Sequence, residues 1–457
     1  MLRNLPTVLI IAGSDPSAGA GSQQDLKVAT LMGTYGLTVL TAITVQNSRG
    51  VQRLEPVAPD LVAAQLQAIL ADIPVKAIKI GMLATAAIVR EVAAAVREVP
   101  APVVVDPVLA ASDGTPLLEE AGRRVLQEEL LPLATVVTPN LAEAGLLTGR
   151  QVVDVAGMQD AAMALRQLGP QAVLIKGGHL AGPPVDVLAY GPQCYELPGE
   201  RWDSTHTHGT GCTLATALAA GLAQGWSLPE AVQQARELVA EAIRWGLPLG
   251  QGRGPVHSAA PFLREVERHR VLQALEAAAQ RLRANDISGL IPEVQSNLGY
   301  ATVYPRGPED VAAFPGRLLR TPTGLLIPQG PAFGASRHIA AVILTANRVF
   351  PQLRAAMNIR YVESVEDLAP LLHLRAAHFD RSQEPPQVKA REGSTLAWGV
   401  ASVLDPQQPP PDLIWDRGDW GKEPMIRVLG KDPLDVVAKV LALQQALAAG
   451  ESCQPNR

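Results

Sequence analysis

Short apolar segments alternate with longer amphipathic segments over roughly the first half of the chain. The apolar segments are rich in β-branched residues and bounded by turn residues, which is typical of buried parallel strands. They lie at 7–12, 37–45, 75–80, 101–106, 135–139 and 172–176. Helical patterns lie between and after them, at 22–34, 59–71, 85–97, 117–130, 156–168, 210–224 and 229–244. This alternation predicts an α/β domain whose mainly parallel central sheet is covered by helices on both faces.

Glycine and proline break this pattern at 250–262, and a charged helical segment follows at 263–285. A second set of strand-like runs then occurs at 300–305, 324–329, 376–380, 412–416 and 425–430. Helical patterns accompany them at 335–348, 364–372, 394–404 and 433–449. The sequence therefore predicts a first domain over 1–262, a helical connector over 263–285, and a second, smaller α/β domain over 286–450.

Composition and charge narrow the class of protein. The 457 residues are 47% hydrophobic, which is enough for sizeable cores and excludes a mainly disordered chain. A net charge of −5 gives no electrostatic reason to expect a nucleic-acid partner. Three scattered cysteines do not suit a disulfide framework or a cysteine-based zinc site. No apolar run is long enough for a membrane span or a signal peptide, so we expect a cytoplasmic protein with small-molecule substrates; homo-oligomerisation stays open.

The segment HTHGTGCT (206–213) carries the strongest indication of chemistry. Gly209, Thr210, Gly211 and Cys212 form a turn of small residues at the start of an alanine-rich helix. Backbone N–H groups at such a helix start create a site for anions. The same field would favour a thiolate at Cys212. The alternative is that the small residues serve only tight packing.

Three further segments stand where a strand is followed by a turn or a helix. Gly13 lies in the glycine-rich turn 12–27, and Asp25 lies in the helix after it. Asn140 and Glu143 follow the strand at 135–139; they could orient Mg²⁺ through water or simply cap a helix. Lys176 ends a strand at the edge where parallel sheets bind ligands, so it can neutralise phosphate charge. Each segment alone also fits an ordinary turn, cap or strand end.

Residues 6–260 resemble the hydroxymethylpyrimidine/phosphomethylpyrimidine kinases of thiamine biosynthesis, which have a ribokinase-like three-layer fold. The resemblance is specific because a series of motifs occurs in the family's order. They are AGSDPSAGAG (12–21), QNSRGV (46–51), KIGML (79–83), DPVLAASDG (106–114), TPNLAEA (138–144), KGGH (176–179) and HTHGTGCT. The resemblance implies ATP and Mg²⁺ as cofactors and two successive phosphorylations of 4-amino-5-hydroxymethyl-2-methylpyrimidine.

The resemblance also implies roles for individual residues. The aminopyrimidine pocket would be lined by Gly13, Asp25, Gln46, Met82 and Val108. Mg²⁺ and its waters would be held by Asp106, Asn140 and Glu143, ATP phosphates by Lys176, and charge on the transferred phosphoryl by the turn 209–212. Cys212 stands where many sugar kinases of the wider fold carry an aspartate base. Ala18 stands where the family commonly has glycine, which draws attention to the backbone angles of that turn.

The second domain has no short motif that names a reaction, but cations concentrate in its glycine- and proline-rich loops. Residues 286–449 resemble the ThiN type of thiamine-phosphate synthase through DISGLIPEVQSNLGYA (286–301), GPEDVAAFPGR (307–317), FGASRHIA (333–340), AMNIRY (356–361) and DRGDWGKEPMIRVLG (416–430). The resemblance implies that pyrimidine diphosphate is joined to thiazole phosphate with release of pyrophosphate.

Loop cations next to helix starts suit recognition of phosphate groups. We therefore expect Arg317 and His338 to act together on the departing pyrophosphate. Substrate binding is assigned to Arg337, Asn358 and Arg360, and a bridging Mg²⁺ to Asp380 or Asp416, between which the sequence does not choose.

Three alternatives stay open. The second domain could sense thiamine phosphates without making them, or it could be a scaffold for dimerisation. The first domain could also accept pyridoxine, because pyridoxal kinases share its fold.

Overall fold

The computed structural model describes residues 5–111, 113–389 and 394–452. The chain forms two compact units, Met1–Pro261 and Phe262–Arg457, each described by itself below. Among the described residues, no helix has both the length and the apolar character that a membrane span requires.

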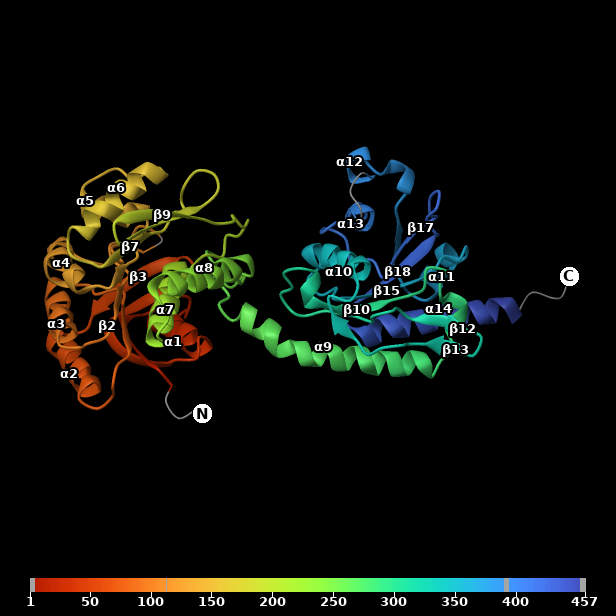
Figure 1. Ribbon diagram of the computed structural model, residues 1–457, viewed down its shortest axis with the longest axis horizontal. Helices are drawn as coiled ribbons and strands as arrows, with labels where there is room; N and C mark the ends of the chain where they lie inside the picture. The colour runs from red at the N-terminus through yellow and green to blue at the C-terminus, as the bar shows by residue number, and fades with distance from the viewer. Residues whose placement is uncertain (1–4, 112, 390–393, 453–457) are drawn as a thin grey trace. The chain divides into compact units, whose positions relative to one another are not determined.

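Unit 1 is built on a nine-stranded sheet with helices on both faces (Figure 1). The strand order is β3-β2-β1-β4-β5-β6-β7-β8-β9. The six neighbouring strands β2, β1, β4, β5, β6 and β7 run parallel. The strands are β1 Thr7–Ser14, β2 Tyr35–Asn47, β3 Gly50–Pro56, β4 Ala77–Ile80, β5 Val103–Val105, β6 Val136–Val137, β7 Ala172–Ile175, β8 Val185–Tyr190 and β9 Gln193–Pro198. The predicted parallel strands are all present; β3 and the β8–β9 hairpin, which pair antiparallel, extend the sheet at its two edges.

The helices of unit 1 divide between the two faces of the sheet (Figure 1). One face carries α1 Gly21–Leu31, α7 Thr210–Ala223 and α8 Leu228–Arg244, which pack on one another. The other carries α2 Pro59–Leu70, α3 Ala86–Arg97, α4 Glu120–Val125, α5 Leu141–Thr148 and α6 Val155–Arg166. Val8 to Ile11 of β1 are fully buried, as expected for a strand covered on both sides. The carboxyl ends of the parallel strands therefore form one shared edge.

Unit 2 contains a seven-stranded sheet in the order β14-β11-β10-β15-β18-β17-β16, and a separate two-stranded sheet, β12-β13. All pairs are antiparallel except β16 with β17. The strands are β10 Leu298–Ala301, β11 Val311–Ala313, β12 Leu319–Thr321, β13 Gly324–Leu326, β14 Ala332–Phe333, β15 Ala355–Arg360, β16 Ala376–His378, β17 Leu413–Asp416 and β18 Met425–Gly430. The helices are α9 Ala260–Arg283, α10 Arg337–Val349, α11 Val365–Leu371, α12 Pro386–Lys389, α13 Ser394–Ala401 and α14 Pro433–Ser452.

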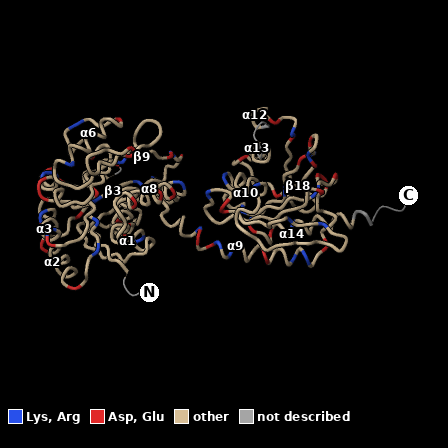
Figure 2. Tube along the Cα trace, in the orientation of Figure 1, with Lys and Arg blue, Asp and Glu red and all other residues tan. Residues whose placement is uncertain are grey.

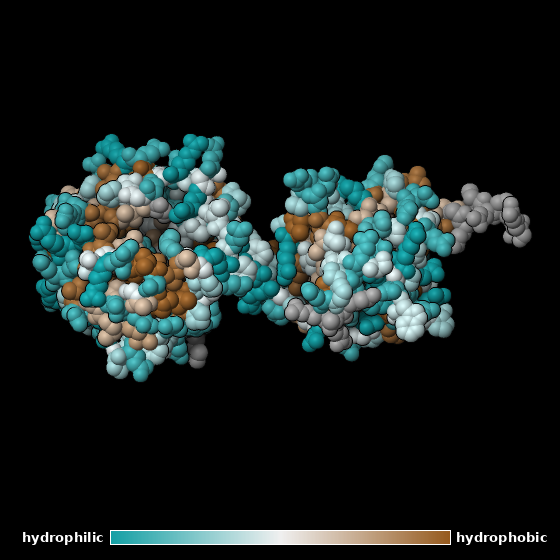
Figure 3. All heavy atoms as spheres, turned by 90° about the horizontal axis from the view of Figure 1, so that it is seen from above, coloured by the Kyte–Doolittle hydropathy of each residue, from teal (hydrophilic) through white to brown (hydrophobic). Residues whose placement is uncertain are grey.

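Alternate residues of this sheet face two separate apolar cores. Met357 and Val428 pack with α9 and α14, while Ala356 and Leu429 pack with α10 and α13. This is the period-two alternation of strands that are covered on both faces. Apolar side chains also reach the surface in patches among hydrophilic ones (Figure 3), as is usual for folded proteins.

The segment expected to be a connector is helix α9, and it belongs to the core of unit 2. Val271, Leu275 and Leu282 are fully buried against the sheet of that unit. Near the start of the helix, Arg268 Nη1 lies 3.2 Å from the buried Asp310 carboxylate. Figure 2 shows acidic and basic residues along α9, which explains why the sequence alone suggested a solvated helix.

This packing predicts where the chain can be divided. We expect a fragment of residues 262–457 to unfold cooperatively, and a fragment of residues 286–457 not to fold. Each large apolar side chain that is fully buried contributes about 1.5–3 kcal/mol, against about 5–15 kcal/mol for a whole domain. Urea unfolding followed by circular dichroism measures both fragments. Equal unfolding midpoints would show that α9 is dispensable and that the connector interpretation was right.

Candidate active site

The start of α7 is in close contact with two charged side chains. Gly209, with φ 83°, caps the helix in the left-handed region, and a β-carbon there would collide with the carbonyl oxygen of Gly19. A β-carbon at Gly211 would lie 3.1 Å from Asp106 Oδ2 and 3.3 Å from Lys176 Nζ. The small residues of this turn thus let the positive helix end approach Lys176 and Asp106.

Three predicted residues meet beside this turn. Lys176 Nζ lies 2.8 Å from Asp106 Oδ1 and 3.9 Å from Glu143 Oε2. Asp106 follows β5, Glu143 lies in α5 after β6, and Lys176 follows β7, so neighbouring strands deliver them to one edge. Burial alone would lower the pKa of Lys176, but Asp106 and Glu143 outweigh it and raise that pKa. Lys176 therefore carries a positive charge at neutral pH.

Asn140 and Glu143 form the helix cap that the sequence left as an alternative. Asn140 Oδ1 accepts a hydrogen bond from Glu143 N at 2.9 Å, and Glu143 Oε2 accepts one from Asn140 N at 2.8 Å. Burial raises the pKa of the Glu143 carboxyl to about 7, against the opposing charge of Lys176. The described residues contain no group of three or more acidic, cysteine or histidine side chains arranged around a metal. This donor set fits a Mg²⁺ held chiefly by phosphates and water rather than by a protein cage.

The surroundings of Cys212 do not favour the thiolate that the helix field suggested. Burial of the thiol raises its pKa to about 12, and the nearby charge of Lys79 opposes this only in part. The correction has a simple cause, because loss of hydration disfavours the charged form more than the helix end and Lys79 favour it. Cys212 is therefore a protonated thiol at neutral pH.

Asp25 was expected in the pyrimidine pocket, but it is fully buried with both oxygens engaged. Lys79 Nζ lies 2.7 Å from Asp25 Oδ2, and Thr216 Oγ1 donates to Asp25 Oδ1 at 2.7 Å. The carboxylate thus ties β4, α1 and α7 together and has no free oxygen for a ligand. The role of Lys79 was not predicted, although a lysine inside the apolar strand AIKI indicates a buried ion pair.

The other predicted pocket residues lie close together. Met82 covers Gly13 so closely that a β-carbon at Gly13 would collide with its side chain. Met82 and Val108 belong to one small apolar cluster. Gln46 lies at the end of β2 and contacts His208, with its carboxamide 3.3 Å from His208 Nε2.

Two polar residues of this region were missed. Asp15 accepts hydrogen bonds from Ser17 N and Ala20 N, both at 2.9 Å, and His208 Nε2 lies 2.9 Å from Asp15 Oδ2. Asp15 thereby fixes the glycine-rich turn, in which Ala18 adopts φ 56°. Ala18 thus takes the left-handed conformation that explains a glycine preference there. Asp15 lies within AGSDPSAGAG and His208 within HTHGTGCT, and their place in these motifs was the indication that the sequence offered of a role at the site.

The predicted synthase residues of unit 2 are spread over its sheet. Arg317 follows the carboxyl end of β11 and donates to Val294 O, whereas His338 lies in the first turn of α10, after β14. Because β11 and β14 are antiparallel, these positions follow opposite ends of the pair. Within the described residues no hydrogen bond or ion pair joins Arg317 to His338, so joint action stays a prediction.

Asn358 and Arg360 lie on β15, two strands from β11. The Asn358 side chain is engaged by backbone: Oδ1 accepts from Asn297 N at 2.7 Å, and Nδ2 donates to Gln295 O at 3.1 Å. Arg360 is exposed at the end of its strand. Asn358 thus supports the chain before β10, and Arg360 keeps a free approach for a ligand.

Burial distinguishes Asp380 from Asp416 as a candidate Mg²⁺ ligand and favours Asp380. Asp416 is fully buried, with Arg381 Nε at 2.5 Å and Arg427 Nη1 at 2.6 Å, and Gly418 N donates to it at 2.8 Å. These partners occupy both of its oxygens. Asp380 is exposed and retains one oxygen beyond its bond to Ser382 N.

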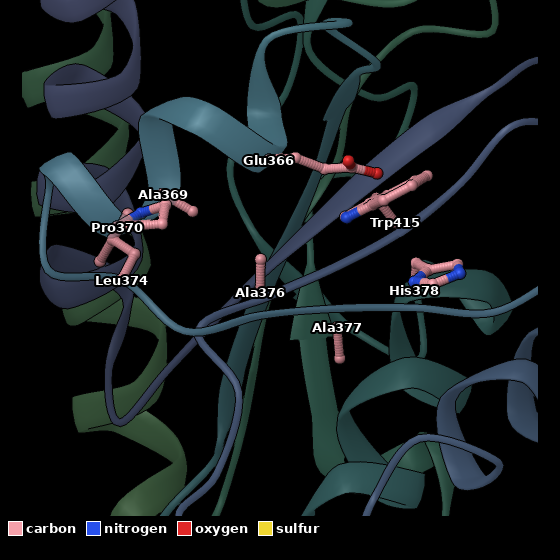
Figure 4. A pocket seen from close by; sticks show the side chains of 8 residues that line it. All are labelled: Glu366, Ala369, Pro370, Leu374, Ala376, Ala377, His378 and Trp415. Carbon is pink, nitrogen blue, oxygen red and sulfur yellow. The ribbon is translucent and has the colours of Figure 1, made fainter.

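A shallow cavity of about 350 Å³ opens at the far edge of the unit 2 sheet (Figure 4). It lies between α11, β16 and β17, and its lining is mainly small and apolar. His378 stacks on Trp415 with ring centroids 4.8 Å apart, and Glu366 is the one carboxylate of the lining. None of the residues proposed from the sequence lines it.

Comparison with known proteins identifies two regions. Residues 15–257 match the family model for phosphomethylpyrimidine kinase, and residues 274–442 match the model for thiamine-phosphate synthase ThiN. A hydroxymethylpyrimidine/phosphomethylpyrimidine kinase of Streptomyces coelicolor is 49% identical over 251 residues, which is 55% of this chain and 93% of that protein. The thiamine biosynthesis bifunctional protein ThiED of Geobacter sulfurreducens is 48% identical over 253 residues, which is 55% of this chain and 52% of that protein.

Solved structures give the same fold for the first region. The ADP complex of Bacillus subtilis pyridoxal kinase is 39% identical with a TM-score of 0.53, covering 57% of this chain and 100% of that one. The pyridoxal kinase of Staphylococcus aureus with AMP-PCP and pyridoxal is 38% identical with a TM-score of 0.51, and the match covers 55% of this chain and 93% of that one. The expected ribokinase-like α/β fold is thereby confirmed.

The pKa of Glu143 makes a testable difference to stability. Because that pKa is about 7 in the folded protein against an ordinary 4.5, the folded state keeps a proton that the unfolded chain loses between these values. The free energy of unfolding that this group contributes is thus greatest below its ordinary pKa and falls as the pH rises toward 7. We expect Glu143→Gln to remove this fall, so that the wild-type Tm declines relative to the variant's across the interval.

Glu230 provides a matched control. It is the third residue of another capping box, with Ser227, but it is exposed and hydrogen bonds from Ser227 lower its pKa. Glu230→Gln is expected to parallel the wild type between about pH 5 and pH 7. Parallel Tm curves for Glu143→Gln and wild type would contradict the raised pKa.

Proposed function

This chain belongs to the phosphomethylpyrimidine kinase family and carries a ThiN thiamine-phosphate synthase region later in its sequence, and we propose from this how its two units act. It is a multifunctional transferase of thiamine biosynthesis. Unit 1 uses MgATP to phosphorylate 4-amino-5-hydroxymethyl-2-methylpyrimidine and then its monophosphate. Unit 2 joins the diphosphate to thiazole phosphate, giving thiamine phosphate and pyrophosphate. Both steps take place in the cytoplasm on small-molecule substrates.

The observation that carries the kinase proposal is the approach of the α7 turn to Lys176 and Asp106. Phosphoryl transfer needs mainly positioning and neutralisation of charge. Lys176 meets the phosphates of ATP, and the N–H groups of residues 209–212 stabilise charge on the transferred phosphoryl. Asp106, with Asn140 and Glu143 close by, would hold Mg²⁺ through water, and the ion would supply further neutralisation of the phosphate oxygens.

The substrate hydroxyl loses its proton as its oxygen bonds to the γ-phosphorus and ADP departs. Cys212 does not take this proton, because a protonated thiol has no basic lone pair of useful strength. The proton passes to solvent or to an oxygen of the transferred phosphoryl, because Asp106, the carboxylate next to the turn, is paired with Lys176 and assigned to Mg²⁺. Met82, Gly13 and Val108 form the apolar wall of the pyrimidine pocket, with Gln46 at its polar end.

In unit 2 the bond from the pyrimidine methylene carbon to pyrophosphate breaks, and the thiazole nitrogen takes its place. The electron-rich aminopyrimidine stabilises the cation that forms, so the protein has to hold pyrophosphate and exclude water. Arg317 suits pyrophosphate because its planar fork binds two oxygens. Arg337 and His338 stand at the start of the thirteen-residue helix α10, where N–H groups favour anions. Arg360, exposed at the end of β15, is proposed to bind the second phosphate, and Asn358 supports this set by holding the chain before β10.

The structural likeness to pyridoxal kinases keeps a second activity in view for unit 1. Pyridoxal and pyridoxine present a hydroxymethyl group on a six-membered aromatic ring, as the pyrimidine alcohol does. We propose the pyrimidine as the main substrate because the relatives with 49% and 48% identity carry names of pyrimidine or thiamine biosynthesis.

Cys212 provides a specific test of the kinase mechanism. We expect Cys212→Ala to reduce pyrimidine phosphorylation about 10²-fold or more, as for loss of a group next to the transferred phosphoryl. Cys212→Ser is expected to keep most activity, because a hydroxyl can replace a protonated thiol as a hydrogen-bonding group. Steady-state kinetics measures both, and synthesis from supplied pyrimidine diphosphate is the control. A serine variant as inactive as the alanine variant would restore the thiolate interpretation.

The synthase proposal is tested with the diphosphate and thiazole phosphate supplied directly. We expect the whole chain to form thiamine phosphate, and Arg317→Ala and His338→Ala each to lower the rate about 10²–10³-fold. Phosphorylation of the pyrimidine alcohol by the same variants serves as the control and is expected to stay at the wild-type rate. Wild-type synthesis in both variants would show that the site lies elsewhere. Tight binding of thiamine phosphate without any turnover by the unmutated chain would establish the sensor alternative.

A further inference from the structure

The glycine-rich turn, the end of β2 and the start of α7 meet at the imidazole of His208. His208 Nε2 lies 2.9 Å from Asp15 Oδ2 and 3.3 Å from the carboxamide nitrogen of Gln46. A β-carbon at Gly19 would collide with the imidazole, so the ring fills the space against that turn. The side chain is only 14% exposed, which holds it in one orientation.

The charge of Asp15 determines where the proton of His208 lies. Burial alone would raise the pKa of Asp15, but hydrogen bonds from His208, Ser17 and Ala20 outweigh it and hold that pKa below its ordinary value. At neutral pH the carboxylate can only accept hydrogen bonds. His208 Nε2 therefore carries a hydrogen and donates to Asp15, so it cannot also accept one from Gln46.

Thr44 fixes the other end of the Gln46 carboxamide. The Thr44 hydroxyl donates to Ser14 O at 2.9 Å, so it has no hydrogen left for Gln46 Oε1, which lies 3.4 Å away. Exchanging the two ends of the carboxamide satisfies both contacts: the NH₂ group then donates to the Thr44 oxygen, and the carboxamide oxygen shares the single Nε2–H of His208 with Asp15. The two ends of an amide are distinguished by such partners.

We propose that His208 is a positioning residue for substrate selection: it orients the Gln46 carboxamide so that one lone pair and one N–H remain for the ligand. This inference rests on the pyrimidine kinase activity proposed above. A 4-aminopyrimidine presents an amine N–H beside a ring nitrogen, which is the complementary donor and acceptor pair. The carboxamide oxygen would accept from the amine, and its N–H would donate to the ring nitrogen. A ring without that amine would satisfy only half of this arrangement.

The proposal differs from a purely structural role of His208 in what it predicts. If His208 only held the two turns together, its loss would weaken binding of ATP and of every ring substrate alike. If it orients Gln46, its loss affects the substrate bearing the amine and reduces selectivity for that amine. The selectivity between two ring substrates is therefore the informative measurement.

The test uses the whole chain with MgATP and two alcohols, 4-amino-5-hydroxymethyl-2-methylpyrimidine and its analogue without the amine. We expect His208→Phe, which keeps a ring against Gly19, to raise the KM for the aminopyrimidine about tenfold, the equivalent of one hydrogen bond. The KM for ATP should stay within about twofold, and the preference for the amine should fall by the same tenfold factor. His208→Gln should restore the preference, because its NH₂ group can donate to both Asp15 and Gln46. His269→Phe, at an exposed histidine of α9, is the control.

The outcomes separate this inference from the function on which it rests. A wild-type chain that neither binds the aminopyrimidine in calorimetry nor phosphorylates it overturns the proposed kinase function and the inference together. An active wild type whose preference for the amine is unchanged in His208→Phe overturns the inference alone. If His208→Phe does not fold, Thr44→Val removes the other constraint on the carboxamide, and full selectivity in that variant overturns the proposal.

Discussion

The approach of the α7 amino terminus to Lys176 and Asp106 is the constraint on which the kinase unit depends. The helix can come this close only because the turn lacks bulk: Gly209 takes a left-handed conformation against Gly19, and a β-carbon at Gly211 would meet both charged side chains at 3.1–3.3 Å. The sheet provides the other half, because β5, β6 and β7 end side by side. Chemistry and packing thus share the same few atoms, and a larger residue in the turn would disturb both.

A buried ion pair lies beside this turn and joins the elements around it. Lys79 and Asp25 are completely buried and 2.7 Å apart, and they join β4 to α1, while Thr216 adds α7. Removing one partner of such a pair typically costs about 3–5 kcal/mol, since the other is left as an uncompensated buried charge. Unit 2 also contains buried ion pairs, in which Asp416 lies between Arg381 and Arg427. In both units, almost fully buried charges join a strand of the sheet to neighbouring segments.

The sequence predicted all six parallel strands of unit 1, because continuous apolar runs such as 7–12 are characteristic of strands covered on both faces. It missed β3, β8 and β9, whose partly exposed residues give no such run. It also treated α9 as a connector, because charges along that helix conceal the apolar stripe of Val271, Leu275 and Leu282. In unit 2, β11, β12 and β14 are only two or three residues long, too short for a periodic pattern.

The sequence predicted which residues of the candidate site come together, but not the protonation state of Cys212 or the long-range partners. The meeting of Asp106, Glu143 and Lys176 follows from strand ends sharing one edge, whereas the state of Cys212 depends on burial, which no motif reveals. Lys79, Asp15 and His208 were missed because their roles arise from contacts across 54 and 193 positions of sequence.

In the proposed order, two phosphoryl transfers in unit 1 precede pyrophosphate release in unit 2. This order can be measured with ATP labelled at the γ-phosphate, supplied together with pyrimidine alcohol and unlabelled thiazole phosphate. We expect two ADP for each thiamine phosphate, with the label in pyrophosphate and none in thiamine phosphate. Formation of AMP, or label in thiamine phosphate, would contradict the proposed order.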